Sequence, residues 1–427
     1  MIAFALILLL ILMALAIPVA ASLGTLGLLL DQFYGFLPLT KAAGEIAWSS
    51  SNEFLLVSLP LFIMLGEILL RSGLAEKMYG ALANWLSWLP GGLMHSNIAA
   101  CALFAATSGS SVATAATVGT VALPQARRFG YNERLFLGTL AAGGTLGILI
   151  PPSINMIIYA VLTNTSVPKL YLAGIVPGIA LMALFMLIVL AACAIKPQWG
   201  GARMRSTATE MFAGLIHLLP PVGIFLVVVG SIYAGIATPT EAASLGVMAG
   251  LLLAAWTRRL SCHMLKNVLE GTMRTTAMVM LIIVAAYFLN FVISAIGLTT
   301  QLTDFIERLG FSKWEMLAAV IMFYLMLGCF METLSMMITT IPIIAPVMIK
   351  LGFDPVWFGI VVIILIEAAL ITPPVGLNLF VVQNLRRGGP LHDVIVGAAP
   401  FVVAMLLLLL LLALAPGIAL WLPARFG

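Results

Sequence analysis

The chain has 427 residues, of which 63% are hydrophobic and 8% are charged. Soluble domains carry about 25% charged residues, so this composition excludes a soluble enzyme or binding domain and predicts an all-α polytopic membrane protein. The net charge of +4 comes from short Lys and Arg clusters between apolar runs, a pattern typical of cytoplasmic loops and not of nucleic-acid binding.

The apolar run at the N-terminus, about 2–29, is interpreted as a first membrane helix and not as a signal peptide. It lacks a basic n-region, and the run is longer than ~15 residues. Later apolar windows predict further spans, each near the ~20 residues that cross the hydrocarbon. These windows are about 54–70, 135–160, 170–195, 214–236, 241–257, 276–297, 354–385 and 393–420. Segments 74–88 and 262–274 are amphipathic and predict helices that lie in the membrane interface or pack against a partner.

Two interrupted apolar stretches, 92–123 and 314–345, predict re-entrant helical hairpins. The tip of the first is small, hydroxylated and glycine-containing, with candidate site residues Ser108, Gly109, Ser110, Ser111 and Thr114. Open backbone at membrane depth must be buried in protein or face water. Its carbonyls and hydroxyls suit a cation such as Na⁺, and its N–H groups suit an anion. The alternative is that these small residues allow close helix packing.

The span at 135–160 predicts a broken helix. Its candidate residues are Gly143, Gly144, Thr145, Pro151, Pro152, Ser153 and Asn155. Because proline lacks an N–H group, the two prolines leave upstream carbonyls unpaired, and a bound cation would supply the missing partner. The alternative is a proline kink healed by neighbouring hydroxyls.

The second half of the chain repeats this arrangement at a constant offset of 222 residues, from Pro151-Pro152 to Pro373-Pro374. Helix breakers at matching positions point to the binding site of a transporter. The second broken helix, 354–385, supplies Glu367, Thr372, Pro373, Pro374, Gly376 and Asn378, and the second hairpin tip supplies Glu332 and Thr333. The paired breaks predict Na⁺ at Ser110, Thr145, Thr372 and Gly376.

Three acidic residues fall inside apolar stretches, where they are costly. Glu332 and Glu367 are interpreted as functional, in cation binding or protonation. Glu67 is interpreted as a residue at a helix end that pairs with Arg71 four positions later.

The basic residues predict how the chain threads the membrane. If both hairpins enter and leave on the same side, 14 of the 20 Lys and Arg residues fall on one face, which is then cytoplasmic. The N-terminus is then cytoplasmic and the C-terminus periplasmic. The chain is one transport domain of two inverted repeats, about 1–200 and about 214–427, which predicts alternating access around one site.

Four segments carry a family resemblance: Phe104–Thr114 (FAATSGSSVAT), Ala141–Ser153 (AAGGTLGILIPPS), Leu172–Gly178 (LAGIVPG) and Leu370–Phe380 (LITPPVGLNLF). In this order they resemble the large membrane subunit of TRAP transporters, and the similarity covers nearly the whole chain. One departure is Glu332, which stands where family members often have Asp.

The resemblance implies a Na⁺-coupled importer of organic acids, such as C4-dicarboxylates or sialic acid, in the bacterial inner membrane. It implies an elevator-like fold in which the hairpins and broken helices move. It also implies a small membrane subunit and a periplasmic substrate-binding protein as partners.

Three alternatives are weighed against import of this kind. An ion-coupled carboxylate permease could work without a binding protein. An intramembrane hydrolase would need a base near the serines at 108–111, and the sequence offers no convincing His or Asp partner there. A purely structural scaffold would leave the paired hairpins and broken helices unexplained.

Overall fold

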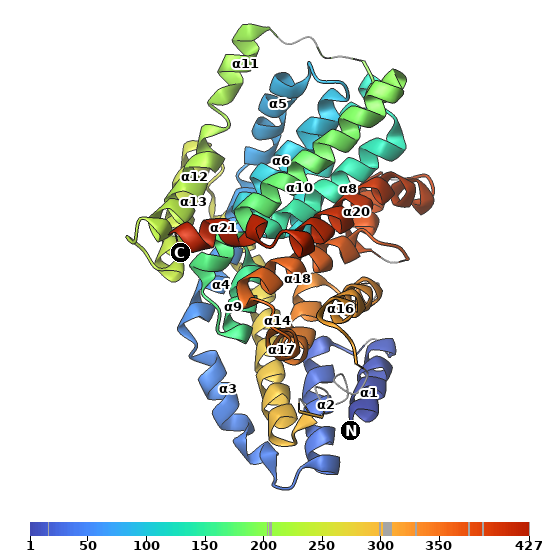
Figure 1. Ribbon diagram of the computed structural model, residues 1–427. Coiled ribbons are helices and arrows are strands. Elements are labelled where there is room, and N and C mark those ends of the chain that lie inside the picture. The colour runs from blue at the N-terminus through green and yellow to red at the C-terminus, as the bar shows by residue number, and fades with distance from the viewer. Residues whose placement is uncertain are drawn as a thin grey trace.

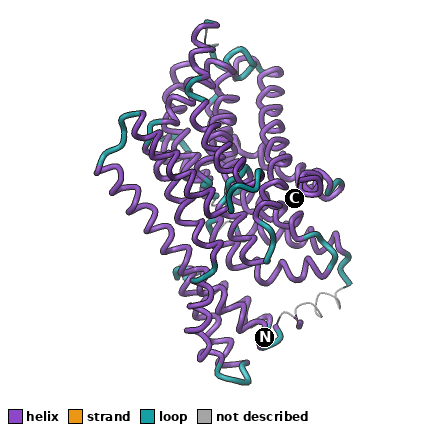
Figure 2. Tube along the Cα trace, turned by 90° about the vertical axis from the view of Figure 1, so that its left-hand side faces the viewer, coloured by secondary structure: helices purple, strands orange, loops and turns teal. Residues whose placement is uncertain are grey.

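Helices form the whole framework of the chain (Figure 1). The computed structural model describes residues 1–15, 17–202, 204, 207–298, 300–301, 310–328, 331–374, 376–386 and 388–426, without the side chains of 2, 3, 13, 14, 106–108 and 208. Over these residues Figure 2 shows helices and loops and no strand. Within the same residues seven helices are long and apolar enough to cross a membrane, and one bent pair brings the number to eight. The all-α polytopic fold is therefore confirmed.

The helices of the first half are α1 Ile2–Ala14, α2 Val19–Tyr34, α3 Ala43–Ser51, α4 Ser58–Arg71, α5 Leu74–Leu86, α6 Gly92–Ser108, α7 Ser111–Phe129, α8 Glu133–Leu149, α9 Ile154–Thr163 and α10 Val167–Ile195. Those of the second half are α11 Ala208–Leu215, α12 Leu219–Tyr233, α13 Pro239–Trp256, α14 Cys262–Ala295, α16 Lys313–Leu327, α17 Thr333–Lys350, α18 Pro355–Leu370, α19 Leu377–Arg386, α20 Leu391–Leu414 and α21 Gly417–Phe426. Short 3-10 turns lie at Leu39–Ala42, Phe54–Val57 and Pro197–Gly200.

Two expectations about spans were wrong. The single helix expected at 2–29 is two helices, α1 and α2, which pack against each other, and Pro18 stands immediately before α2. Proline has no N–H to continue a helix but suits its start. In contrast, the amphipathic segment 262–274 is not separate from the span at 276–297. Both belong to α14, which runs unbroken for 34 residues.

Helix bounds recur along the chain near the 222-residue offset. The hairpin helices α6 and α7 have counterparts in α16 and α17, α8 and α9 in α18 and α19, and α10 in α20. The chain leaves the second hairpin helix through a glycine with positive φ in each half, Gly130 (65°) and Gly352 (82°), a conformation that other residues rarely adopt. Both hairpins are longer than the expected 92–123 and 314–345, since α7 ends at Phe129 and α17 at Lys350.

The helices pack in two groups. One joins α2, α3, α4, α12, α13 and α14; the other joins α6 to α10 with α16 to α21 (Figure 1). Within the second group the halves cross over: α7 packs on α19, and α17 packs on α9. Segments distant in sequence therefore meet where the hairpins and the broken helices come together.

Arg386, at the end of α19, is buried and ties α8 to α20. Its guanidinium donates to Glu133 Oε1 (2.8 Å) and to Asp393 Oδ2 (3.0 Å), and Arg134 donates to the other oxygen of Asp393 (2.8 Å). Arg127 of α7 donates to the carbonyl oxygen of Arg386 at 2.9 Å. Basic residues of the segments 125–134 and 386–387, which were both expected on the cytoplasmic face, thus lie close together.

Candidate functional site

A cavity of about 280 Å³ lies where the two helix groups meet. Its walls come from the starts of α7 and α17, the break between α8 and α9, and the faces of α4 and α14. Six residues expected from the sequence line it: Gly109, Ser110, Ser111, Asn155, Glu332 and Thr333. The tips of both hairpins and one helix break therefore share a single space.

The first hairpin turns at Gly109, whose φ of 61° is accessible to glycine with little strain. Ser110 is extended and caps α7, because its hydroxyl oxygen accepts the N–H of Ala113 at 3.4 Å. Since Ser110 to Ala113 line the cavity, the N-terminus of α7 faces it. Free N–H groups and the helix dipole favour an anion at such a place. Ser108 is the last residue of α6, and its side chain lies outside the described residues.

The second hairpin presents its own helix start to the same cavity. Glu332 stands 222 residues after Ser110 and takes the same role, since its carboxylate caps α17. Glu332 Oε1 accepts the N–H and the hydroxyl of Ser335, both at 3.1 Å. None of the ion pairs among the described residues includes Glu332. Among the described residues, the Glu332 carboxylate is therefore stabilised by hydrogen bonds and by the helix start and not by a basic side chain.

The break between α8 and α9 bends the pair by 45°. The Pro151–Pro152 peptide is cis, and Ser153 caps α9 by accepting the N–H of Met156 at 3.4 Å. Pro152 presents its carbonyl oxygen 3.5 Å from the position of a Cβ at Gly109, so the break lies against the hairpin tip. Pro151, Pro152 and Ser153 do not line the cavity themselves.

Asn155 is the polar side chain that the break places at the cavity. It is 1% exposed, and its Nδ2 has no hydrogen-bond partner among the described residues. An unpaired buried amide costs about 1–3 kcal/mol. A ligand oxygen in the cavity would supply the missing acceptor.

Glu367 lies behind the cavity and not in its wall. It is 1% exposed on α18, and Ser111 donates its hydroxyl to both carboxylate oxygens at 2.7 Å. This contact joins the first hairpin tip to the second broken helix. Glu367 therefore reaches the cavity through Ser111.

The second break, between α18 and α19, lies away from this cavity. Thr372 donates its hydroxyl to Ala368 O at 2.7 Å, and Pro373 and Pro374 are exposed. Gly376 has a φ of 44°. None of these four break residues lines the cavity. The two breaks are thus chemically alike in sequence but differ in what covers them.

Gly143, Gly144 and Asn378 lie in the packing around the tip. A Cβ at Gly143 would meet Cys101 Sγ at 2.9 Å, and one at Gly144 would meet Ser111 O at 3.0 Å and Asn378 Nδ2 at 3.1 Å. The glycines let α8 approach α6 and α7. Asn378 is fully buried, and its Oδ1 has no partner among the described residues.

Two threonine hydroxyls expected at the site bond to helix carbonyls. Thr145 donates to Ala142 O at 2.6 Å, and Thr114 donates to Ser110 O at 2.7 Å. Both threonines are buried and outside the cavity wall.

Glu67 is the cavity residue that sequence reasoning missed. Its expected ion pair with Arg71 is present, yet Glu67 also lines the cavity, together with Thr275 of α14. A Cβ at Gly271 would meet Glu67 Cδ at 2.8 Å, so α14 packs directly on this carboxylate. The signal available in the sequence was the acid itself, which lies in an apolar stretch. The contact of Glu67 with α14 is a tertiary contact, which the local sequence does not reveal.

This arrangement can hold a small polar ligand between two helix starts. The cavity offers a donor at Asn155, hydroxyls at Ser110 and Thr333, and a carboxylate at Glu332. None of the described residues that line it is Lys or Arg. An anion bound here would meet N–H groups and hydroxyls.

The chain is similar to known proteins in sequence and in fold. Residues 6–418 match the family model described as "Tripartite ATP-independent periplasmic transporter, DctM component". The chain is 34% identical to the C4-dicarboxylate TRAP transporter large permease protein DctM of Pseudomonas aeruginosa, over 89% of this chain and 88% of that one. It is 30% identical to the sialic acid TRAP transporter large permease protein SiaM of Vibrio cholerae, over 92% of each chain. The fold also matches the solved YdaH transporter of Alcanivorax borkumensis, with a TM-score of 0.65 at 16% identity over 98% of this chain and 99% of that one.

Proposed function

The chain belongs to the DctM component family of the tripartite ATP-independent periplasmic transporters, and from that premise we propose that it is the large permease subunit of a Na⁺-coupled importer of an organic acid. The relatives' names support a C4-dicarboxylate or sialic acid as the substrate class. "Tripartite" in the family's description supports two partners, which we propose are a small membrane subunit and a periplasmic binding protein. The membrane is then the bacterial inner membrane.

The observation that carries this proposal is the cavity between the hairpin tips. Its volume of about 280 Å³ suits a small metabolite, and Asn155 in its wall has an amide nitrogen without a hydrogen-bond partner among the described residues. Two helix starts supply further donors. The amide of Asn155 and the N–H groups at the start of α7 favour a carboxylate over a cation or an apolar ligand.

Na⁺ is proposed as the coupling ion. The residues fit it: Na⁺ is a hard cation that prefers oxygen ligands, and the first tip and break offer Ser110 Oγ and the Pro152 carbonyl. At the second break we propose Thr372 and Gly376 as the corresponding oxygen ligands, whereas the residues 222 positions after Ser110 and Thr145 are Glu332 and Glu367. Glu332, a carboxylate with no basic partner among the described residues, would hold a cation close to the substrate.

Alternating access is proposed to follow from two inverted repeats, with α6 to α10 and α16 to α20 moving as one body against α2 to α4 and α12 to α14. The crossed packing of α7 on α19 and α17 on α9 supports one moving body. The cluster of Arg127, Arg134 and Arg386 supports a cytoplasmic face for these basic segments. The N-terminus would then be cytoplasmic and the C-terminus periplasmic.

Uptake into proteoliposomes tests the function directly. We expect vesicles that hold this chain and its small membrane partner, with the binding protein outside, to accumulate labelled succinate or sialic acid. Collapse of the Na⁺ gradient should lower the initial rate at least about tenfold, because the ion gradient supplies the driving force. Unchanged uptake without the gradient would contradict Na⁺ coupling. Uptake that persists without the binding protein would favour the simpler ion-coupled carboxylate permease.

Replacement of Ser110 by alanine should raise the Na⁺ concentration for half-maximal uptake about tenfold, since loss of one oxygen ligand worth ~1.4 kcal/mol changes an affinity by that factor. The variant also loses a helix cap worth about 1 kcal/mol. Ser261→Ala is the matched control: Ser261 caps α14 by accepting the N–H of Met264 at 3.1 Å and is exposed. An equal change in Na⁺ activation in both variants would mean that the cap, and not the site, is responsible.

A further inference from the structure

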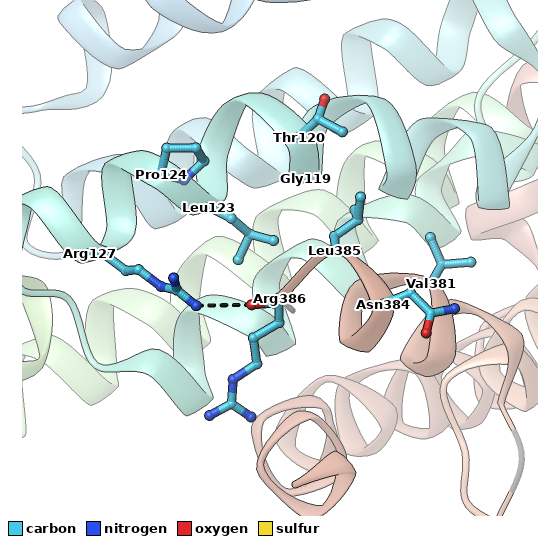
Figure 3. A pocket seen from close by; sticks show the side chains of 9 residues that line it. All are labelled: Gly119, Thr120, Leu123, Pro124, Arg127, Val381, Asn384, Leu385 and Arg386. Atoms are coloured by element: carbon cyan, nitrogen blue, oxygen red, sulfur yellow. Dashed lines mark hydrogen bonds between the residues drawn. The ribbon is translucent and has the colours of Figure 1, made fainter. Parts of the chain in front are cut away.

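Two grooves lie on either side of the cavity, each along the second helix of a hairpin. The first, of about 760 Å³, runs between α7 and α19; the second, of about 680 Å³, runs between α17 and α9 with a further wall from α14. Figure 3 shows the first groove, with Arg127 at one end and Asn384 at the other. It begins at Gly119, about 9 Å along α7 from the cavity residue Ala113 at 1.5 Å per residue.

The grooves are equivalent residue by residue. Seven of the nine residues that line the first have a lining counterpart in the second at an offset of 222 residues. Pro124 corresponds to Pro346, for example, and Leu385 corresponds to Thr163. Because α7 and α17 both run away from the cavity, the grooves lead from it in two directions.

Both grooves have the same charge sign. Arg127 and Arg386 line the first and Lys350 lines the second, whereas none of the described residues that line either groove is acidic. Next to the first groove the acids Glu133 and Asp393 pair with Arg386 and Arg134, so these four charges cancel and Arg127 adds one positive charge in excess. A groove lined by one sign of charge raises the local concentration of the opposite ion.

The guanidinium of Arg127 is placed to receive an anion. It is exposed, and the structure describes one hydrogen bond for it, from Nη2 to the carbonyl oxygen of Arg386 at 2.9 Å. An arginine has five N–H donors in a planar fork that matches a carboxylate. Thr120 and Asn384 add polar groups farther along the groove (Figure 3), and Thr120 lies nearer than Arg127 to the start of α7, which lines the cavity.

We propose that the two grooves are vestibules of the cavity: a carboxylate anion reaches the cavity through the periplasmic groove and leaves it through the cytoplasmic groove. Arg127 is the residue that attracts the anion in the cytoplasmic groove. The inference rests on the proposed function and orientation. A small anion is favoured over a lipid tail, because each groove ends in a basic residue and continues along a helix toward a polar cavity.

Thiol labelling tests the vestibule without any need for transport. In the full chain with Cys101, Cys193, Cys262 and Cys329 replaced by serine or alanine, Thr120→Cys should react with membrane-impermeant thiosulfonates from the cytoplasmic side only. Ile349→Cys, an exposed position of the second groove, should react from the periplasmic side only. Thr120 and Arg127 lie two helical turns apart, about 10 Å, on one face of α7. Arg127→Gln should therefore lower the ratio of anionic to cationic reagent rates at Thr120→Cys about fourfold.

Arg128→Gln is the matched control. Arg128 neighbours Arg127 but does not line the groove, so it should change the same ratio by less than about twofold because water and salt screen it. Equal shifts from both arginines would overturn the assignment of Arg127. A Thr120→Cys thiol that no aqueous reagent reaches would show that lipid fills the groove and would overturn the vestibule.

Transport then separates this inference from the proposed function. In exchange assays with labelled succinate or sialic acid, whichever the wild-type complex carries, Arg127→Gln should raise the half-saturating concentration of internal substrate about tenfold. The half-saturating concentration of external, binding-protein-loaded substrate should stay unchanged, and Arg127→Lys should restore most of the internal affinity. A wild-type complex that carries neither acid would count against the proposed function, whereas wild-type kinetics in Arg127→Gln would count against the vestibule alone.

Discussion

Gly138→Ala is expected to lower the free energy of unfolding by about 3 kcal/mol, the upper end of the usual cost of overpacking. Gly138 of α8 faces Gly397 of α20, where a new Cβ would overlap the Gly397 carbonyl. The same holds in reverse, since a Cβ at Gly397 would overlap the carbonyl of Arg134. These obstacles are backbone atoms and cannot rotate away, so the two helices would have to separate.

The measurement is an unfolding titration in mixed detergent micelles, followed by tryptophan fluorescence. Gly230→Ala in α12 is the matched control, because a Cβ there would meet no atom within 4 Å. Alanine has a higher helix propensity than glycine by up to about 1 kcal/mol, so the control should be neutral or more stable. Equal losses at Gly138 and Gly230 would contradict the close approach of α8 and α20.

Glu367→Ala should reduce transport more than tenfold, whereas Glu367→Gln should keep most of it. Alanine leaves the buried Ser111 hydroxyl without its acceptor, and a polar group of this kind costs about 1–3 kcal/mol when unpaired. Glutamine keeps a side-chain oxygen at the same distance from the backbone, so the first hairpin tip stays in place. Initial uptake rates in proteoliposomes measure both variants.

A double-mutant cycle with Ser111→Ala supplies the control for this pair. If Glu367 acts by positioning Ser111, the losses from Ser111→Ala and Glu367→Ala should be much less than additive. Loss of transport in Glu367→Gln equal to that in Glu367→Ala would show that the negative charge is required. Glu367 would then be a cation ligand and not a positioning residue.

The features that the sequence predicted well are those that the backbone itself dictates. Pro151 and Pro152 lack N–H groups and interrupt α8 and α9 wherever the helices pack, and a glycine such as Gly109 marks a turn for a similarly local reason. Pro18 carried the same signal before α2, but a hydropathy average over 2–29 hides a single breaker inside an apolar run.

The features that escaped prediction depend on which helices meet. Glu67 pairs with Arg71 as its spacing suggests, yet its place in the cavity depends on α14 packing across α4. Likewise the two Pro-Pro breaks have similar sequences, but Ser153 of the first break is buried whereas Pro373 and Pro374 of the second are exposed. Local chemistry repeats in the two halves; the burial around it is set by long-range contacts.

The unbroken course of α14 has a mechanical consequence. Its 34 residues make a rod about 51 Å long, whereas the hydrocarbon core is about 30 Å thick. The rod contacts α17 of the other packing group, and its opposite end carries Lys266 and Glu270 beyond the apolar stretch. A stiff rod pivots as a lever, so a tilt imposed where it contacts α17 would reach the far surface with its direction reversed. A tilt of α14 caused by binding on one side of the membrane would thereby move residues on the other side without any change in conformation inside the helix.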